Sequence, residues 1–330
     1  LADAQPAVRI AATNVLSALG TATAIPGLIA RLDDATPAVA VTAASALAEF
    51  DDPRVVEALV RAADRPGHPA ADEALDALGH QHDPRVLPAL RRALADRARR
   101  PAAIRALGQT GDPRAVDLLL PLLKDPASRV AVLEQLCRMV DPRTIDAVLP
   151  LAIQSGAAQE SAIRALGATH DPRVVPVLAR FLRDHRRETD DLRYAALVAL
   201  SWVPDRRAAQ DALIIQTRDA DALISQTALE LLVQQPDAGL RDLLLGFARK
   251  PQPDLRDLAL YGLAQLPDAR AVQAVLNGLR DPGSRERIYD MQNLNVYWQL
   301  AHNPKATPRD LIAMLQLAGH EALAPEAALV

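Results

Sequence analysis

The stretch Asp83-Pro84-Arg85-Val86-Leu87-Pro88-Ala89-Leu90 decides the fold, because it recurs almost unchanged along the chain. Its Asp-Pro-Arg start returns at residues 52–54, 112–114, 141–143 and 171–173, so the five arginines lie 31, 29, 29 and 30 residues apart. A fixed period of this size indicates an array of repeats rather than a single globule.

The three residues that open each copy have the properties of a helix start. An aspartate at the N-cap accepts hydrogen bonds from the free N–H groups of the first turn. A proline at the next position lacks an N–H and already has a helical φ. Apolar residues then follow in steps of three and four on one helix face, here Leu87, Leu90 and Leu94. Each motif therefore predicts an amphipathic Asp-Pro-Arg helix, whose arginine we expect to brace a neighbouring repeat through its carbonyls or an aspartate.

A second helical pattern, rich in alanine, precedes each Asp-Pro-Arg helix. It is predicted over residues 6–19, 37–50, 70–78, 101–107, 128–139 and 158–166. Four of these helices are followed by a glycine, which we expect to be the left-handed residue that commonly ends a helix: Gly20, Gly79, Gly108 and Gly167. The pattern persists beyond residue 190, with alanine-rich helices predicted over 191–202, 222–233 and 254–266. Second helices are predicted to start near Asp205, Asp237 and Asp268.

Composition narrows the classes of function. The 330 residues are 50% hydrophobic but only 3% aromatic, which suits thin layers of closely packed helices. A formal charge of -4 gives no general attraction to nucleic acid or to an anionic membrane. The single cysteine, Cys137, excludes an intrachain disulfide and a cysteine-based metal site. No apolar run has the length of a membrane span. The chain starts at Leu1 inside a repeat, so we expect a trimmed piece, and we expect a cytoplasmic location.

The alternation of an alanine-rich helix with an Asp-Pro-Arg helix resembles short HEAT repeats, the bacterial type also called PBS-lyase HEAT-like repeats. The resemblance implies an all-α fold, a right-handed α–α superhelix (α-solenoid) of about ten helical hairpins that share one core. We predict that residues 1–283 form the array. Residues 284–330 are predicted to form a divergent C-terminal capping repeat and tail, with a longer, more aromatic helix over 284–300.

The family that this chain resembles also includes enzymes, and their functional residues can be compared with this sequence. Deoxyhypusine hydroxylase binds two irons through several His-Glu pairs, whereas this chain has one such pair, His320-Glu321, in its tail. Phycobilin lyases share the repeats, but nothing in the sequence marks a bilin pocket. No phosphate loop and no nucleophile with a paired base is present. We therefore predict no catalytic, cofactor-binding or metal-binding residue, with a bilin-lyase-like protein as an open alternative.

The main functional prediction is a monomeric, non-enzymatic scaffold or adaptor that binds a protein or peptide. The resemblance implies that the Asp-Pro-Arg helices line the concave surface, where their exposed fifth and ninth positions differ from repeat to repeat. The candidate partner-binding residues at these positions are Glu57, Arg61, Arg92, Asp117, Asp146 and Arg180.

Nucleic-acid binding is the alternative from another class. Arginines crowd the stretch from Arg85 to Arg105, and basic side chains are the groups that neutralise phosphates. The candidate basic patch consists of Arg91, Arg92, Arg97, Arg99 and Arg100.

Overall fold

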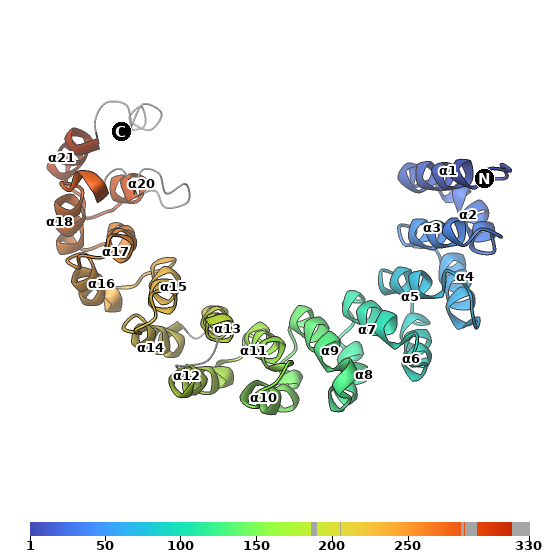
Figure 1. The fold of residues 1–330 in the computed structure, drawn as a ribbon. Coiled ribbons are helices and arrows are strands. Elements are labelled where there is room, and N and C mark those ends of the chain that lie inside the picture. The colour runs from blue at the N-terminus through green and yellow to red at the C-terminus, as the bar shows by residue number, and fades with distance from the viewer. Residues whose placement is uncertain (186–189, 205, 285–286, 288–295, 319–330) are drawn as a thin grey trace. The chain divides into compact units, whose positions relative to one another are not determined.

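The computed structural model describes residues 1–330 except 186–189, 205, 285–286, 288–295 and 319–330. The chain divides into two compact units, unit 1 (Leu1–Val174) and unit 2 (Val175–Val330). In the described residues both units contain helices and no strands, so the prediction of an all-α helical solenoid is confirmed (Figure 1). None of the helices in this part of the chain is both long enough and apolar enough to span a membrane.

Unit 1 consists of helices in two layers (Figure 1). The alanine-rich helices form the inner layer, on the inside of the unit's curve, and comprise α1 (Pro6–Leu19), α3 (Pro37–Leu47), α5 (Ala71–Gly79), α7 (Arg100–Gln109), α9 (Pro126–Met139) and α11 (Gln159–Ala168). The Asp-Pro-Arg helices and their degenerate N-terminal counterpart form the outer layer, which comprises α2 (Ile25–Leu32), α4 (Pro53–Asp64), α6 (Val86–Ala95), α8 (Arg114–Leu119) with its 3-10 continuation η2 (Leu120–Lys124), and α10 (Ile145–Ile153).

Small residues explain why the alanine-rich helices are on the inside. Ala40, Ala43 and Ala44 of α3 are completely buried. A Cβ added at Gly79 would lie 2.8 Å from the carbonyl oxygen of Ala106 in α7. Neighbouring inner helices therefore pack more closely than the larger side chains of the outer layer allow, and the stack curves toward them.

The glycine prediction is correct only at Gly20, which ends α1 with a left-handed φ of 61°. Gly79 and Gly108 lie within α5 and α7, and Gly167 lies within α11. Added Cβ atoms at Gly79 and Gly108 would collide with the next inner helix. At these two positions glycine serves close packing rather than helix termination.

The Asp-Pro-Arg motif opens a helical turn in every copy, but only α4 begins at the proline with the aspartate as its N-cap. The α6 and α8 helices begin at Val86 and Arg114, and 3-10 turns at Pro142–Thr144 and Pro172–Val174 precede α10 and α12. In all five copies the aspartate accepts a hydrogen bond from the backbone N–H of the arginine, at 2.8 Å. The guanidinium of each arginine folds back onto the same aspartate, as in the 2.7 Å pair of Arg54 with Asp52. This pair holds the pKa of Asp52 down to about 2. Only Arg85 and Arg143 also reach the preceding copy of the motif, through the carbonyls of Pro53 and Pro113.

A different set of arginines braces successive repeats. Arg9, near the start of α1, pairs at 2.8 Å with Asp34, which lies just before α3. Arg100 of α7 pairs at 3.0 Å with Asp125, just before α9. The hydrogen bond from Arg9 is the largest cause of the lowered pKa of Asp34. Because the partners lie 25 residues apart, each pair ties one inner helix to the next.

Prolines in the outer helices have two outcomes. Pro121 lies in the 3-10 segment η2, where α8 ends early, as expected for a residue that removes a helical hydrogen bond. Pro150 is accommodated inside α10.

Unit 2 repeats the same two layers (Figure 1). Its inner helices are α13 (Asp190–Ser201), α15 (Ala222–Val233), α17 (Pro253–Gln265) and α20 (Val296–Ala301). Its outer helices are α12 (Val175–Asp184), α14 (Arg206–Gln216), α16 (Arg241–Phe247), which follows the 3-10 turn η5 (Ala238–Leu240), α18 (Ala269–Gly278) and α21 (Pro308–Ala318).

The braces between inner helices continue in unit 2. Arg193 pairs with Asp219 at 2.5 Å, and Arg256 pairs with Asp281 at 2.7 Å. Of the helix predicted over 284–300, the structure describes α20. Tyr289, Asp205 and the His320-Glu321 pair lie outside the described residues. The capping role of residues 284–330 stays a prediction.

Candidate binding surfaces

The candidate partner-binding residues lie on the outer layer. They are exposed on α4, α6, α8, α10 and α12: Glu57, Arg61, Arg92, Asp117, Asp146 and Arg180. The prediction that Asp-Pro-Arg helices line the inside of the curve is therefore wrong, because close packing of alanine and glycine places the other helices there. Three of the six already have partners, since Arg92 pairs with Asp64, Asp117 with Arg143 and Arg180 with Asp184.

The candidate basic patch is largely neutralised within unit 1. Arg92 pairs with Asp64 at 2.8 Å, Arg99 with Asp96 at 2.8 Å and Arg100 with Asp125 at 3.0 Å. Within the described residues, the patch members with no carboxylate partner are Arg91 and Arg97. Two unpaired guanidiniums are few for a surface that must neutralise a run of phosphates. Nucleic-acid binding stays a prediction, and this geometry does not strengthen it.

Each inner helix of unit 1 has a residue at an equivalent position near its middle whose side chain points away from the packed core. We call this set the inner row: Asn14, Ser45, Asp76, Arg105, Glu134 and Arg164. The residue before each member and the leucine two residues after it belong to the packed side in α3, α5, α7, α9 and α11. The core thus repeats while the inner row changes in charge and size. Sequence reasoning missed this row because it assigned the alanine-rich helices to the other side of the stack.

The inner row is electrostatically mixed. Asp76 pairs with Arg105 at 2.9 Å across two repeats, and this hydrogen bond is the main reason that the pKa of Arg105 is raised. Asp72 and Glu73 add to the effect through their charges. Glu73 also accepts a hydrogen bond from Ser45.

An acidic recess opens on this face between α3 and α5, with a volume of about 570 Å³. Its lining includes four carboxylates and two histidines, Glu49, Asp51, Glu73, Asp76, His80 and His82. No set of three or more potential metal-binding side chains converges here or elsewhere among the described residues.

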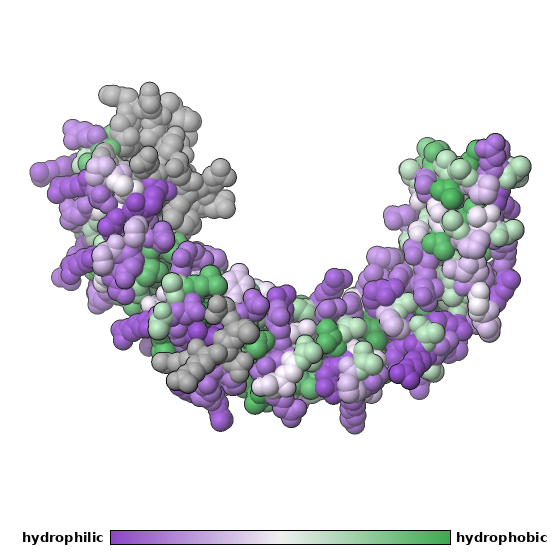
Figure 2. Space-filling view, viewed as in Figure 1, coloured by the Kyte–Doolittle hydropathy of each residue, from purple (hydrophilic) through white to green (hydrophobic). Residues whose placement is uncertain are grey.

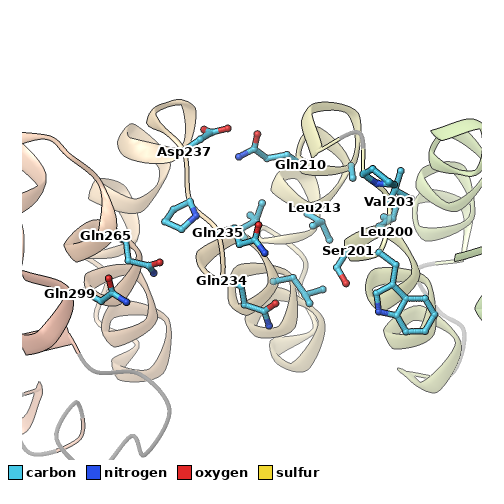
Figure 3. A pocket seen from close by; sticks show the side chains of 16 residues that line it. Leu200, Ser201, Val203, Gln210, Leu213, Gln234, Gln235, Asp237, Gln265 and Gln299 are labelled. Carbon is cyan, nitrogen blue, oxygen red and sulfur yellow. The ribbon is translucent and has the colours of Figure 1, made fainter. Parts of the chain in front are cut away.

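A groove of about 600 Å³ opens in unit 2 (Figure 3). We call it the glutamine groove, because five of its lining residues are glutamines: Gln210, Gln234, Gln235, Gln265 and Gln299. The lining residues come from the C-terminal ends of α13, α15 and α17, from the following loops, from α14 and from α20. Leu200, Val203 and Leu213 also line the groove but are almost fully buried, so most of the exposed apolar surface comes from Trp202.

The polar groups of the glutamine groove are mostly free. Gln265 donates to the carbonyl oxygen of Val233 at 2.9 Å, which fixes its side chain. Within the described residues the amides of Gln210, Gln234, Gln235 and Gln299 make no hydrogen bond. A glutamine amide offers two N–H donors and a carbonyl acceptor. The groove is therefore rich in uncharged hydrogen-bonding capacity. Hydrophilic side chains cover much of the face of the molecule that Figure 2 shows.

Comparisons with known proteins point to one kind of repeat. A family model described as HEAT repeats matches residues 1–71 and 69–137. The model of the PBS lyase HEAT-like repeat matches residues 158–184. A comparison with curated protein sequences gives no match.

Solved structures with a similar fold include two karyopherins. A Kap121p mutant is 12% identical over 98% of this chain and 43% of its own, with a TM-score of 0.54. Kap95p, from a structure with RanGDP, is 15% identical over 93% of this chain and 47% of its own, with a TM-score of 0.55. The CpcE–CpcF complex of a Nostoc phycocyanin lyase is 20% identical over 76% of this chain and 91% of its own, with a TM-score of 0.33.

Proposed function

Because the chain is a HEAT-repeat protein, we propose that it is a non-enzymatic scaffold that binds a protein partner through the inner row of unit 1. The observation that carries the proposal is the contrast between a repeating core and a changing inner row. On the inner layer the changing positions are equivalent in six successive packed helices, which suits an extended contact along that layer.

The charges of the inner row indicate how such a contact gains specificity. Glu134 lies between Arg105 and Arg164 in the order of repeats, and all three are exposed. Complementary charges across an interface mainly suppress wrong partners and accelerate association. Kap95p, which has the same fold, binds RanGDP, so this architecture is compatible with a protein partner. A partner for this chain would present a basic group near Glu134 and acidic groups that replace the carboxylates of Asp76 and Glu160 at Arg105 and Arg164.

Site-specific photocrosslinking in cells tests the proposal. A photoreactive amino acid is placed at Ser45 or Arg164 of the inner row and, as matched controls, at Arg61 or Arg91 of the outer layer. We expect one protein adduct from the inner positions and none from the outer ones, because only the inner row faces the partner.

Charge reversal then measures the contact with the partner that was crosslinked. We expect Glu134→Lys and Arg164→Glu each to weaken binding at least tenfold, and Arg61→Glu to leave it unchanged. Equal crosslinking on both layers, or reversals without effect, would show that the inner row is not the contact surface.

A bilin-lyase-like role is the second candidate, and its support is the match of residues 158–184 to the PBS lyase HEAT-like repeat. Incubation of the protein with phycocyanobilin tests it. A red shift and sharpening of the visible absorption at equimolar protein would favour this role, and an unchanged spectrum would count against it.

A further inference from the structure

The glutamine groove follows the repeat of unit 2. Trp202 comes directly after α13, Gln234 comes directly after α15, and Gln265 ends α17. These three residues are therefore equivalent positions in successive repeats, and α20 adds Gln299 beyond them. Figure 3 shows Val203 and Gln299 at opposite ends of the groove, with Gln234 and Gln265 between them.

We propose that the glutamine groove binds a peptide segment of about nine residues in an extended, polyproline II-like conformation, with a basic residue facing Asp237. The inference rests on the proposed function, since it gives the scaffold a second contact of defined chemistry in unit 2.

The spacing of the repeats favours this conformation. Packed helices lie about 8–10 Å apart, whereas a polyproline II chain rises about 3.1 Å per residue with three residues per turn. One repeat of the solenoid therefore matches about one turn of the peptide. From Trp202 to Gln299 the groove crosses four inner helices, or three steps, which corresponds to about nine residues.

The hydrogen-bonding groups favour a peptide backbone as the ligand. A polyproline II chain has no internal hydrogen bonds, so its backbone groups stay available to a partner. Gln234 and Gln235 are exposed, and their amides are unpaired within the described part of the chain. An amide can both donate to a peptide carbonyl and accept from a peptide N–H, independent of the peptide side chain.

The apolar surface and the charge define the side chains of the peptide. Trp202 is 38% exposed and lines the groove together with Val203 and Pro204. Aromatic-lined grooves are a common docking site for polyproline II segments. Asp237 is the only ionisable residue among the described residues that line the groove. One of its carboxylate oxygens caps η5 by accepting from Gly239, at 2.7 Å. Its other oxygen has no partner among the described residues and is available to a lysine or arginine of the peptide.

Selection from a phage library of random nine-residue peptides tests the inference on the whole chain. A selected peptide is labelled with fluorescein, and its affinity is measured by fluorescence anisotropy. We expect selected peptides to carry a basic residue and proline or other extended-chain residues. We expect at least tenfold weaker binding for Trp202→Ala and for the double variant Gln234→Ala/Gln235→Ala.

Two further variants separate the groove from general effects. Gln109 is an exposed glutamine at the end of α7 in unit 1, and Gln109→Ala is expected to leave peptide affinity unchanged. Asp237→Asn keeps an oxygen for the cap but removes the charge. Asp237→Asn is expected to weaken the binding of basic peptides several-fold. It should leave unchanged the affinity for a peptide whose basic residue is replaced by glutamine.

The inference is overturned if selection enriches no peptide, or if the groove variants bind a selected peptide as tightly as the unmodified chain. Partner binding that still depends on Glu134 and Arg164 would in that case leave the proposed function standing. Peptide binding that depends on the groove, together with inner-row reversals that leave the partner bound, would overturn the proposed function and support the groove.

Discussion

Replacement of Arg193 by methionine tests which contacts hold the solenoid together. Arg193 is the most buried of the arginines that tie one inner helix to the next, with its side chain 2% exposed and that of Asp219 8% exposed. Methionine fills a similar volume but leaves the carboxylate without its cation. Asp219 then keeps a hydrogen bond from the backbone N–H of Asp221, at 2.9 Å.

The expected cost follows from this burial. Removal of one partner from a buried ion pair destabilises a protein by about 3–5 kcal/mol. The same substitution at Arg9 is a matched control, because Asp34 retains Arg31 at 3.1 Å and the N–H of Thr36 at 2.9 Å. For Arg9→Met we expect a loss of about 2 kcal/mol in the free energy of unfolding, the value of a charged hydrogen bond.

Hydrogen exchange followed by mass spectrometry measures these losses locally. Stability in a repeat array is a sum of neighbouring interfaces, so the effect should concentrate near the altered repeat. In Arg193→Met we expect protection of α13 and α15 to fall by roughly a hundredfold to a few thousandfold. Protection of α3 in unit 1 should stay unchanged.

A double variant completes the test. Arg193→Met with Asp219→Leu removes both charges, and an apolar pair of similar volume often costs little. We therefore expect it to recover most of the lost protection. The reasoning is refuted if Arg193→Met costs no more than Arg9→Met, or if the double variant is as unstable as the single one.

Three further predictions address other parts of unit 1 and a matched glycine. Arg54 depresses the pKa of Asp52, so the stability that this pair gives is complete above pH 4 and is lost as pH falls toward 2; the melting temperature of Asp52→Asn should depend less on pH over this range than that of the unmodified chain. Gly108→Ala should lower the free energy of unfolding by about 1–3 kcal/mol in chemical denaturation, because its Cβ would lie 2.8 Å from a side-chain carbon of α9. Gly246 lies in open space on α16, so Gly246→Ala should raise the free energy of unfolding by about 0.5–1 kcal/mol. Changes of the same sign in the two variants would contradict this account. Burial raises the pKa of the Cys137 thiol. Iodoacetamide should therefore alkylate Cys137 more slowly at pH 7.5 in the folded chain than in the chain unfolded by urea. Equal alkylation rates would contradict this prediction.

The candidate contact residues could not be placed from the sequence, although the helices could. The period of Asp83-Pro84-Arg85 located both helices of each early repeat, because caps and apolar spacing act within a few residues. The side of the curve on which each helix lies depends on how closely neighbouring helices approach. Contacts such as that of Gly79 with Ala106 set this approach, and they join residues of different repeats.

The same distinction applies to the arginines. The sequence indicated that one arginine per repeat braces the array and suggested Arg85 and its equivalents. The structure shows that two of these, Arg85 and Arg143, reach the preceding repeat. A second set, Arg9, Arg100, Arg193 and Arg256, ties the inner helices together. Both kinds of arginine lie near an aspartate, but only the tertiary structure brings Asp34 to Arg9 across 25 residues.

The sequence by itself determined the repeat, the helix starts and the class of fold, since local hydrogen bonding and apolar periodicity specify these features. Only the tertiary structure decided which layer is on the inside, which side chains form the inner row, and that Trp202 and five glutamines line one groove. The physical reason is that a surface of a solenoid is assembled from one residue per repeat. Its members meet through packing between repeats, on which the spacing within a single helix has no influence.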